Sequence, residues 1–382
     1  MSQGSGPLKV TAGAGALVWL GAASLAAHEH SVAVRAAEVP PLDAGPRVSV
    51  IMPARNEERG VGRAVASLMA QDYADIEVIV VDDQSTDRTR AEAREAIGRD
   101  RRGQIVDGAE LPDGWVGKSW AAWQGYQRAT GGWLLFTDAD VVHRPDCLGR
   151  CLALATALDR GITLVPRIEV GTHTEAVVLP AAFAMIATFV APGPLVRTPS
   201  SSTAMAAGGF MLMSREDYER IGGHDAIRSR MVDDVSMAER LKAAGRPLRM
   251  VDGVELAHLR MYDGARDMWL GWRKNASFGA ADVPRAVVGS SLVAATAAIG
   301  PLASVAGILS GRHGLAALGT IGWGAQIVTA RINSRWVGGS PAYALAFPAG
   351  VAFIAAAAIR GAIDRLSRKG PVWRGRRYPT AD

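Results

Sequence analysis

The sequence has only two cysteines, Cys147 and Cys151, and none of its seven histidines forms a cluster with the spacing of metal ligands. The two thiols stand four residues apart in a predicted helix, a spacing that suits one buried helical face better than a disulfide framework. The sequence therefore argues against a disulfide-stapled domain and against a histidine metal cluster. We predict both cysteines to be core residues.

Outside the C-terminal tail, the positive and negative charges of the chain cancel. Residues 360–382 hold seven basic and two acidic side chains, which account for the whole formal charge of +5. A basic tail favours an anionic lipid surface or the cytoplasmic side of a membrane. Because the bases are confined to this tail and no nucleic-acid motif accompanies them, we predict no nucleic-acid partner.

The chain is 49% hydrophobic, and several long runs of it contain no charged residue. Residues 10–27 form one such run, at the lower length limit for a membrane-spanning helix. It also resembles a signal peptide, because Lys9 precedes it and Ser24-Leu25-Ala26 has the small residues of a cleavage site. We favour an uncleaved anchor over a cleaved signal peptide. Residues 28–46 read as a linker.

Three more uncharged runs, at 286–309, 314–330 and 342–359, read as membrane helices or hairpins. If the catalytic region is cytoplasmic, three full spans would leave the basic tail outside, against the positive-inside tendency. A further apolar stretch, 176–196, is interrupted by prolines, and we predict that it is buried or lies at the bilayer surface. The sequence leaves open whether one run is re-entrant, two form a short hairpin, or 176–196 is also embedded.

Between residues 47 and 167, short apolar runs alternate with helical patterns, which is typical of βαβ units and a mainly parallel sheet. We predict strands at 48–52, 77–81, 104–106 and 133–137. Helices are predicted at 59–70, 87–97, 118–129 and 144–158.

Polar side chains follow three of these strands. The first strand ends in Pro53-Ala54-Arg55-Asn56-Glu57, and the second in Asp82-Asp83-Gln84-Ser85-Thr86-Asp87. Open α/β sheets bind ligands at the carboxyl ends of their strands, where acids accept hydrogen bonds from a base or ribose. Each motif alone also fits residues that merely cap the next helix.

The third strand delivers Asp138 and Asp140. Two carboxylates in this position are able to share Mg²⁺ or Mn²⁺, which neutralises a diphosphate leaving group. The alternative is a solvated loop with one capping aspartate.

Taken together, the three motifs closely resemble the family 2 glycosyltransferases of GT-A fold, and the resemblance covers residues 48–274. The stretches 115–121, 207–212, 220–224, 260–262 and 373–378 resemble the subgroup that glycosylates carotenoids and related polyprenoid lipids, together with hopanoid-associated enzymes. The fold implied is α/β: a nucleotide-sugar-binding, Rossmann-like mixed sheet flanked by N-terminal and C-terminal transmembrane helices.

The resemblance implies roles for individual residues. Pro53, Arg55 and Glu57 line the nucleotide pocket and Asp83 contacts the base. Asp138 and Asp140 contact the ribose and the metal–diphosphate, and Lys118 is a cation near the diphosphate unless it is only an exposed helix lysine. In the acidic pair, Asp234 is the expected general base. Asp233 stands where the family usually has Glu, and the pair also has the position of a helix cap before residues 235–244.

The family resemblance implies an inverting enzyme that moves one sugar from a nucleotide sugar, with a UDP-sugar favoured, to a lipid. The Gln-x-x-Arg-Trp signature of processive synthases is absent from residues 269–275, where Arg273 and Lys274 face either the diphosphate or the membrane. Alternatives are a polysaccharide or glycolipid synthase, a nucleotide-sensing membrane protein without catalysis, and an inactive domain. The absence of charge from the three C-terminal runs weighs against a transport path.

We therefore predict four regions: an anchor and linker (1–46), a catalytic domain (47–284), transmembrane helices (285–360) and a basic tail (361–382). The predicted location is a bacterial inner membrane, crossed several times, with the catalytic domain in the cytoplasm.

Overall fold

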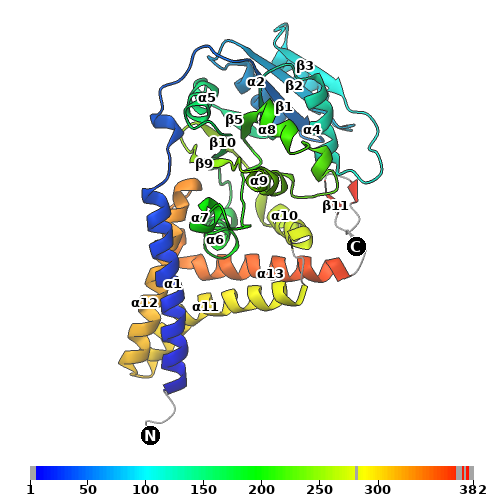
Figure 1. Cartoon of the computed structure of the whole chain (residues 1–382). Helices are drawn as coiled ribbons and strands as arrows, with labels where there is room; N and C mark the ends of the chain where they lie inside the picture. Colours follow the sequence, from blue (N-terminus) through cyan, green and yellow to red (C-terminus); the bar gives the residue numbers. More distant parts are fainter. Residues whose placement is uncertain (1–5, 280–282, 367–371, 374–375, 378–382) are drawn as a thin grey trace. The chain divides into compact units, whose positions relative to one another are not determined.

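The computed structural model describes residues 6–279, 283–366, 372–373 and 376–377 (Figure 1). The predicted basic tail lies largely outside the described residues. The described chain forms two compact units, and each is considered by itself. Unit 1 comprises residues 6–32, 169–193 and the described residues from 262 onward, whereas unit 2 comprises 33–168 and 194–261.

Unit 2 is built on a seven-stranded mixed sheet with the order β3-β2-β1-β4-β8-β6-β9. Only β8 runs against its neighbours β4 and β6, so the predicted mainly parallel sheet is confirmed. The strands are β1 (Val48–Ala54), β2 (Ile76–Asp82), β3 (Gly103–Asp107), β4 (Trp133–Phe136), β6 (Ile162–Val165), β8 (Met211–Ser214) and β9 (Arg249–Asp252).

A second, three-stranded sheet in unit 2 has the order β5-β10-β7. Its strands are β5 (Val141–His143), β7 (Arg167–Ile168) and β10 (Ala257–Leu259). The helices of this unit are α2 (Val61–Met69), α3 (Thr89–Ile97), α4 (Gly117–Arg128), α5 (Cys147–Ala157), α8 (Arg215–Arg220) and α9 (Asp233–Ala243), with short turns η1 (Ala36–Glu38) and η3 (Asp225–Ile227). The short helix α7 (Gly193–Arg197) begins at the last residue of the preceding unit 1 segment.

The register of the central strands determines which loops meet. Ala54 of β1 is level with Asp82 of β2, and Ile51 is level with Phe136 of β4. The loops after these three parallel strands therefore leave the same edge of the sheet. Their strands are almost wholly buried, which explains the continuous apolar runs in the sequence.

The sequence predicted two buried cysteines in α5 and a linker before β1. Cys147 and Cys151 are buried and free on one face of α5, as predicted. Residues 33–46 of the predicted linker are grouped with unit 2. The guanidinium Nη1 of Arg150 donates to the carbonyls of Ala37 and Val39 at 2.9 and 2.6 Å, which fastens this segment to α5.

Unit 1 consists mainly of apolar helices: α1 (Gly6–Ser31), α6 (His173–Met185) with the π-turn η2 (Ile186–Val190), α10 (Gly264–Gly279), α11 (Val283–Leu309), α12 (His313–Asn333) and α13 (Phe347–Leu366). Turns η4 (Ser334–Trp336) and η5 (Pro341–Ala346) join the last two helices, and the short strands β11 (Val372–Trp373) and β12 (Arg376–Arg377) follow. Trp19 of α1 is fully buried in the core of this unit, beside Phe347.

By length and composition, four helical segments of the described chain are apolar enough to cross a membrane: Gly6–Ser31, His173–Val190, Val283–Leu309 and Pro341–Leu366. The predicted apolar runs at both ends are therefore helical. Residues 169–193 and 262–279 group with these helices rather than with unit 2. The predicted boundaries at 46, 284 and 360 remain predictions.

Candidate active site

The loops after β1 and β2 are fastened to each other by reciprocal hydrogen bonds. The backbone N–H of Asn56 donates to Ser85 Oγ at 3.1 Å, and that of Thr86 donates to Asn56 Oδ1 at 2.9 Å. The backbone N–H of Glu57 donates to the buried Thr89 Oγ1 at 2.7 Å. The polar run after β2 therefore holds the loop after β1 in place.

Arg55 and Asp83 stand side by side at the ends of β1 and β2. Nη1 of Arg55 lies 3.9 Å from Asp83 Oδ2 and also donates to the backbone carbonyl of Asp83. Pro53 lies within β1, level with Val81. The structure thus brings together Pro53, Arg55, Glu57 and Asp83, the residues predicted to bind the nucleotide.

Lys118 lies in the first turn of α4, between carboxylates from two other elements. Its Nζ lies 2.8 Å from Asp138 Oδ1, after β4, and 3.3 Å from Asp233 Oδ2, in the first turn of α9. Burial opposes a charged lysine, but Asp138, Asp233 and Asp234 raise the pKa of Lys118 well above its ordinary value. Lys118 is therefore a fixed positive charge within the acidic cluster and not merely a solvated helix lysine.

Asp234 is held by two backbone N–H groups. Gly208 donates to its Oδ2 at 3.0 Å, and Val235 donates to its Oδ1 at 2.7 Å. Burial and the charge of Asp233 raise the pKa of Asp234 to about 6. Burial also opposes ionisation of Asp233, but Lys118 outweighs it and lowers the pKa of that carboxyl. One carboxylate is thus kept ionised by an ammonium group, whereas its neighbour titrates near neutrality.

A side chain at Gly208 would crowd this arrangement. A Cβ atom there would lie 3.0 Å from Asp234 Oδ2 and 3.4 Å from Lys118 Nζ. The next residue, Gly209, accepts a hydrogen bond at 2.8 Å from the hydroxyl of Thr137, which directly precedes Asp138. The glycine pair therefore connects the end of β4 to the acidic pair.

Sequence reasoning assigned no role to Tyr218 and His224. Tyr218 Oη lies 2.9 Å from His224 Nδ1 and accepts a bond of 3.0 Å from the backbone N–H of His224. Both side chains are buried, and burial lowers the pKa of His224 to about 4, with Asp233 acting against that effect. The relevant signal in the sequence is weak, because His224 precedes Asp233 by nine residues without a recognisable spacing.

The predicted metal residues, Asp138 and Asp140, follow β4 in one short loop. Carboxylate oxygens are suitable ligands for Mg²⁺ or Mn²⁺. Among the residues that the structure describes, no group of three or more His, Cys, Asp and Glu side chains is arranged to hold a metal. Two carboxylates still fit an ion that completes its shell with water and diphosphate oxygens, as Mg²⁺ commonly does.

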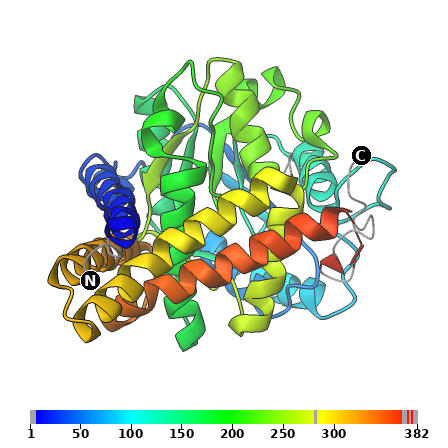
Figure 2. The ribbon, with the colours of Figure 1, turned by 90° about the horizontal axis from the view of Figure 1, so that it is seen from below.

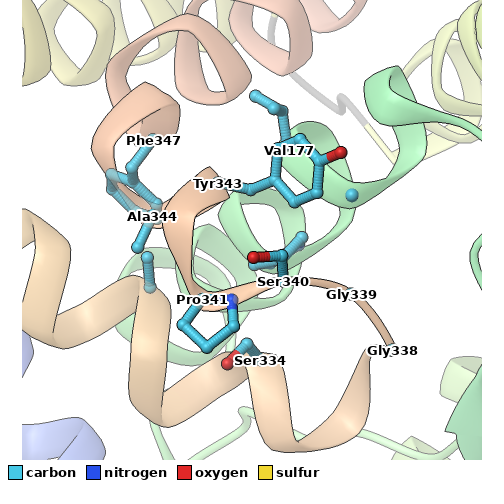
Figure 3. A pocket seen from close by; sticks show the side chains of 12 residues that line it. Val177, Ser334, Gly338, Gly339, Ser340, Pro341, Tyr343, Ala344 and Phe347 are labelled. Atoms are coloured by element: carbon cyan, nitrogen blue, oxygen red, sulfur yellow. The ribbon is translucent and has the colours of Figure 1, made fainter.

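Unit 1 contains a separate small pocket between α6, α12 and η5 (Figure 3). Val177, Pro341 and Phe347 contribute apolar walls, and no acidic or basic side chain lines it. The hydroxyl of Tyr343, at its edge, is bonded to Nδ1 of His173. The pocket therefore lacks the groups needed for acid–base chemistry.

The fold and the strand-end acids define a GT-A glycosyltransferase domain. Residues 49–222 match the family model described as glycosyl transferase family 2. Residues 49–222 therefore match this family, and the resemblance predicted from the motifs is confirmed.

Two curated relatives illustrate the similarity. The 4,4'-diaponeurosporenoate glycosyltransferase of Staphylococcus haemolyticus (strain JCSC1435) is 28% identical over 242 residues, covering 61% of this chain and 62% of that protein. The enzyme of the same name from Staphylococcus aureus (strain USA300) is 29% identical over 238 residues, covering 61% of each chain. The match thus extends over about three fifths of these relatives, whose name agrees with the predicted carotenoid-glycosylating subgroup.

Among solved structures, the mannosyltransferase PcManGT from Pyrobaculum calidifontis, in complex with GDP-Man and Mn2+, is similar over 94% of this chain and 99% of that chain. The TM-score is 0.50 and the identity 21%. This likeness confirms the predicted GT-A fold.

Proposed function

We propose that the protein transfers a single sugar from a nucleoside-diphosphate sugar to a lipid acceptor at the cytoplasmic face of a bacterial membrane. The observation that carries this proposal is the cluster formed by Lys118, Asp138 and the Asp233-Asp234 pair, in which a fixed ammonium group lies 2.8 and 3.3 Å from two carboxylates. The family 2 domain and the glycosyltransferase relatives support the reaction type.

In the proposed reaction, the acceptor oxygen attacks the anomeric carbon from the face opposite the diphosphate. The new C–O bond forms as the bond to the diphosphate breaks, so the configuration at this carbon inverts. Asp234 takes the acceptor proton. Its raised pKa suits this task, since a base with a pKa near the working pH is both largely ionised and able to hold the proton.

The leaving diphosphate requires positive charge. We assign Lys118 to this end of the donor, since its ammonium group belongs to α4 and lies at the carboxyl edge of the sheet. Asp138 and Asp140 would hold a divalent cation, which when bound would neutralise the diphosphate. Pro53, Arg55, Glu57 and Asp83 would bind the nucleoside. GDP-Man in the structure of PcManGT supports a nucleotide-sugar donor, without choosing between the UDP-sugar favoured here and GDP-Man.

The acidic pair favours a hydroxyl as the acceptor group. A hydroxyl must lose a proton during transfer, whereas a carboxylate, such as that in the name of the relatives, is already ionised at neutral pH. A carboxylate acceptor would also meet the charge of Asp233. We therefore propose a polyprenoid-like lipid alcohol, and a matched pair of lipids that differ only in this group tests the choice.

The competing proposal is a processive synthase of the same family. Arg273, in the region where the processive signature would be expected, forms an ion pair with Asp364, whose side chain is 14% exposed. This guanidinium ties α10 to α13 within unit 1, a structural role that does not require a growing polymer.

Product analysis tests the proposal. Purified protein in lipid is incubated with a radiolabelled UDP-sugar and Mn²⁺, and the lipids are separated and weighed by mass spectrometry. The proposal predicts one hexose per lipid molecule. A ladder of longer products would favour a synthase, and donor binding without any transfer would favour a sensor.

A further inference from the structure

Lys118, Asp138, Asp233 and Asp234 form a charged cluster that belongs wholly to unit 2. The apolar helices of unit 1, among them α11 and α13, which lie side by side (Figure 2), supply none of these four side chains. The interactions within the cluster are therefore properties of unit 2.

The loop that carries Asp138 and Asp140 is held by contacts on two sides. The hydroxyl of Thr137, directly before Asp138, donates to the carbonyl of Gly209 at 2.8 Å. From the loop after β1, the Cβ position of Gly60 lies 3.3 Å from Cα of Asp140. The backbone of the loop is therefore packed in place, and a rearrangement of the cluster falls to its side chains.

One ammonium group serves two carboxylates of different exposure. Lys118 Nζ lies 2.8 Å from Asp138 Oδ1 and 3.3 Å from Asp233 Oδ2. The side chains of Lys118 and Asp138 are 40% and 36% exposed, whereas that of Asp233 is 10% exposed. A ligand therefore reaches the contact with Asp138, while the contact with Asp233 is sheltered. Lys118 is long enough to turn away from Asp138 and keep Asp233 as its partner.

Asp138 is also one of the two carboxylates assigned to a divalent cation. A carboxylate oxygen that accepts a hydrogen bond from an ammonium group has fewer lone pairs left for a metal ion. The positive charge of Lys118 also repels a cation that approaches Asp138. Lys118 therefore weakens cation binding for as long as its ammonium group remains on Asp138.

A nucleoside diphosphate changes this competition. Its diphosphate carries several negatively charged oxygens, which are strong acceptors for a lysine ammonium group. When Lys118 turns to these oxygens, the Oδ1 atom of Asp138 loses its present partner and becomes available to a cation. The diphosphate thus removes the competitor and adds oxygen ligands of its own.

We propose that Lys118 couples the two parts of donor binding: it pairs with Asp138 before the nucleotide binds and releases this carboxylate when the diphosphate arrives. This role rests on the proposed function, because the nucleotide and the cation are those of the proposed reaction. Asp138 and Asp140 then bind the cation tightly only when the nucleotide is present. By linkage, the cation strengthens nucleotide binding by the same factor.

Binding of Mn²⁺ to the full-length protein in detergent tests the proposal without any turnover. The electron paramagnetic resonance signal of free Mn²⁺ gives the Kd, without nucleotide and with saturating UDP or, in parallel, GDP. Protein-free titrations correct for the Mn²⁺ that each nucleotide binds in solution. Circular dichroism verifies the fold of every variant.

Three variants separate the role of Lys118 from a general effect of charge. Lys118→Met removes the charge and keeps a similar length, whereas Lys118→Arg retains the charge. Arg128→Met is the matched control, because it removes one positive charge at an exposed position in the last turn of the same helix, α4.

Without nucleotide, we expect Lys118→Met to bind Mn²⁺ about 10-fold more tightly than the wild-type protein, a typical size for coupling between two ligands. Lys118→Arg and Arg128→Met should match the wild type. With saturating nucleotide, the wild type should bind Mn²⁺ as tightly as Lys118→Met does, because its ammonium group has then moved to the diphosphate.

Equal Mn²⁺ affinity of the wild type and Lys118→Met without nucleotide would overturn the proposal, since Lys118 would then not compete for Asp138. An advantage of Lys118→Met that persists unchanged with nucleotide would also overturn it. Should Lys118→Met not fold, a wild-type Mn²⁺ affinity that bound nucleotide does not change has the same meaning. A wild-type protein that binds neither UDP nor GDP would instead contradict the proposed function.

Discussion

The hydroxyl of Tyr218 lies 2.9 Å from Nδ1 of His224 and also accepts the backbone N–H of the same histidine at 3.0 Å. The hydroxyl of Tyr218 is therefore joined to His224 by two hydrogen bonds, one from the backbone N–H and one with the ring nitrogen Nδ1. The pair fixes the ring of a residue whose environment includes Asp233 and Lys118.

Replacement of Tyr218 by Phe should therefore lower turnover. Two buried groups of His224 lose their partner, which costs about 1–3 kcal/mol of stability and loosens the ring. Thermal unfolding and kcat on the folded variant measure the two effects. Tyr126→Phe is the matched control, because its hydroxyl bonds to the exposed Glu219 at 2.8 Å. Equal and small effects of both variants would contradict a positioning role for Tyr218.

Gly208→Ala should reduce kcat by about 10-fold or more, since misplacement of a catalytic group by about 1 Å has a large effect on rate. The added methyl would press on Asp234 Oδ2 at 3.0 Å and displace a carboxylate whose position the Gly208 N–H fixes. Gly132→Ala is the control, since no atom lies within 4 Å of its Cβ position. Wild-type kinetics for Gly208→Ala would show that this contact does not position Asp234.

The rate should depend on pH through Asp234. Burial and Asp233 raise its pKa to about 6, and the base is active only as the carboxylate. We expect kcat/KM to fall about 10-fold per pH unit as the pH decreases below about 6, where the carboxyl group becomes protonated. Circular dichroism over the same range checks that the fold persists. A flat profile between about pH 5 and 7 would contradict the assignment.

The hydrogen bonds between the loops after β1 and β2 predict an effect on donor binding rather than on turnover. Thr89→Val leaves the Glu57 N–H without its acceptor and should lower the free energy of unfolding by about 1–3 kcal/mol. Because these hydrogen bonds position the predicted nucleotide site, the Kd for UDP should rise while kcat at saturating donor changes little. Thr156→Val is a comparable control in α5, where the hydroxyl bonds only to the Leu152 carbonyl. A donor affinity equal to that of the control would show that these hydrogen bonds do not position the nucleotide site.

The sequence predicted the central strands and helices within a few residues, because buried strands such as Val48–Ala54 have continuous apolar runs. It also indicated Asp138 and the Asp233-Asp234 pair, which follow strands or begin a helix. Tyr218 and His224 could not be identified, because their contact depends on a turn with Gly222 and Gly223 at positive φ and on burial against Phe136. The burial of Gln326 was equally inaccessible, since its bond to the carbonyl of Ala297 appears only in the packed bundle.

The central claim is that Asp234 acts as the base for transfer to a lipid hydroxyl. The most direct test measures product formation and UDP-sugar binding for Asp234→Ala beside the wild-type protein in the same lipid. The account predicts that the variant binds the donor with nearly unchanged Kd but forms no hexosylated lipid alcohol. Unchanged turnover in the folded variant would contradict it.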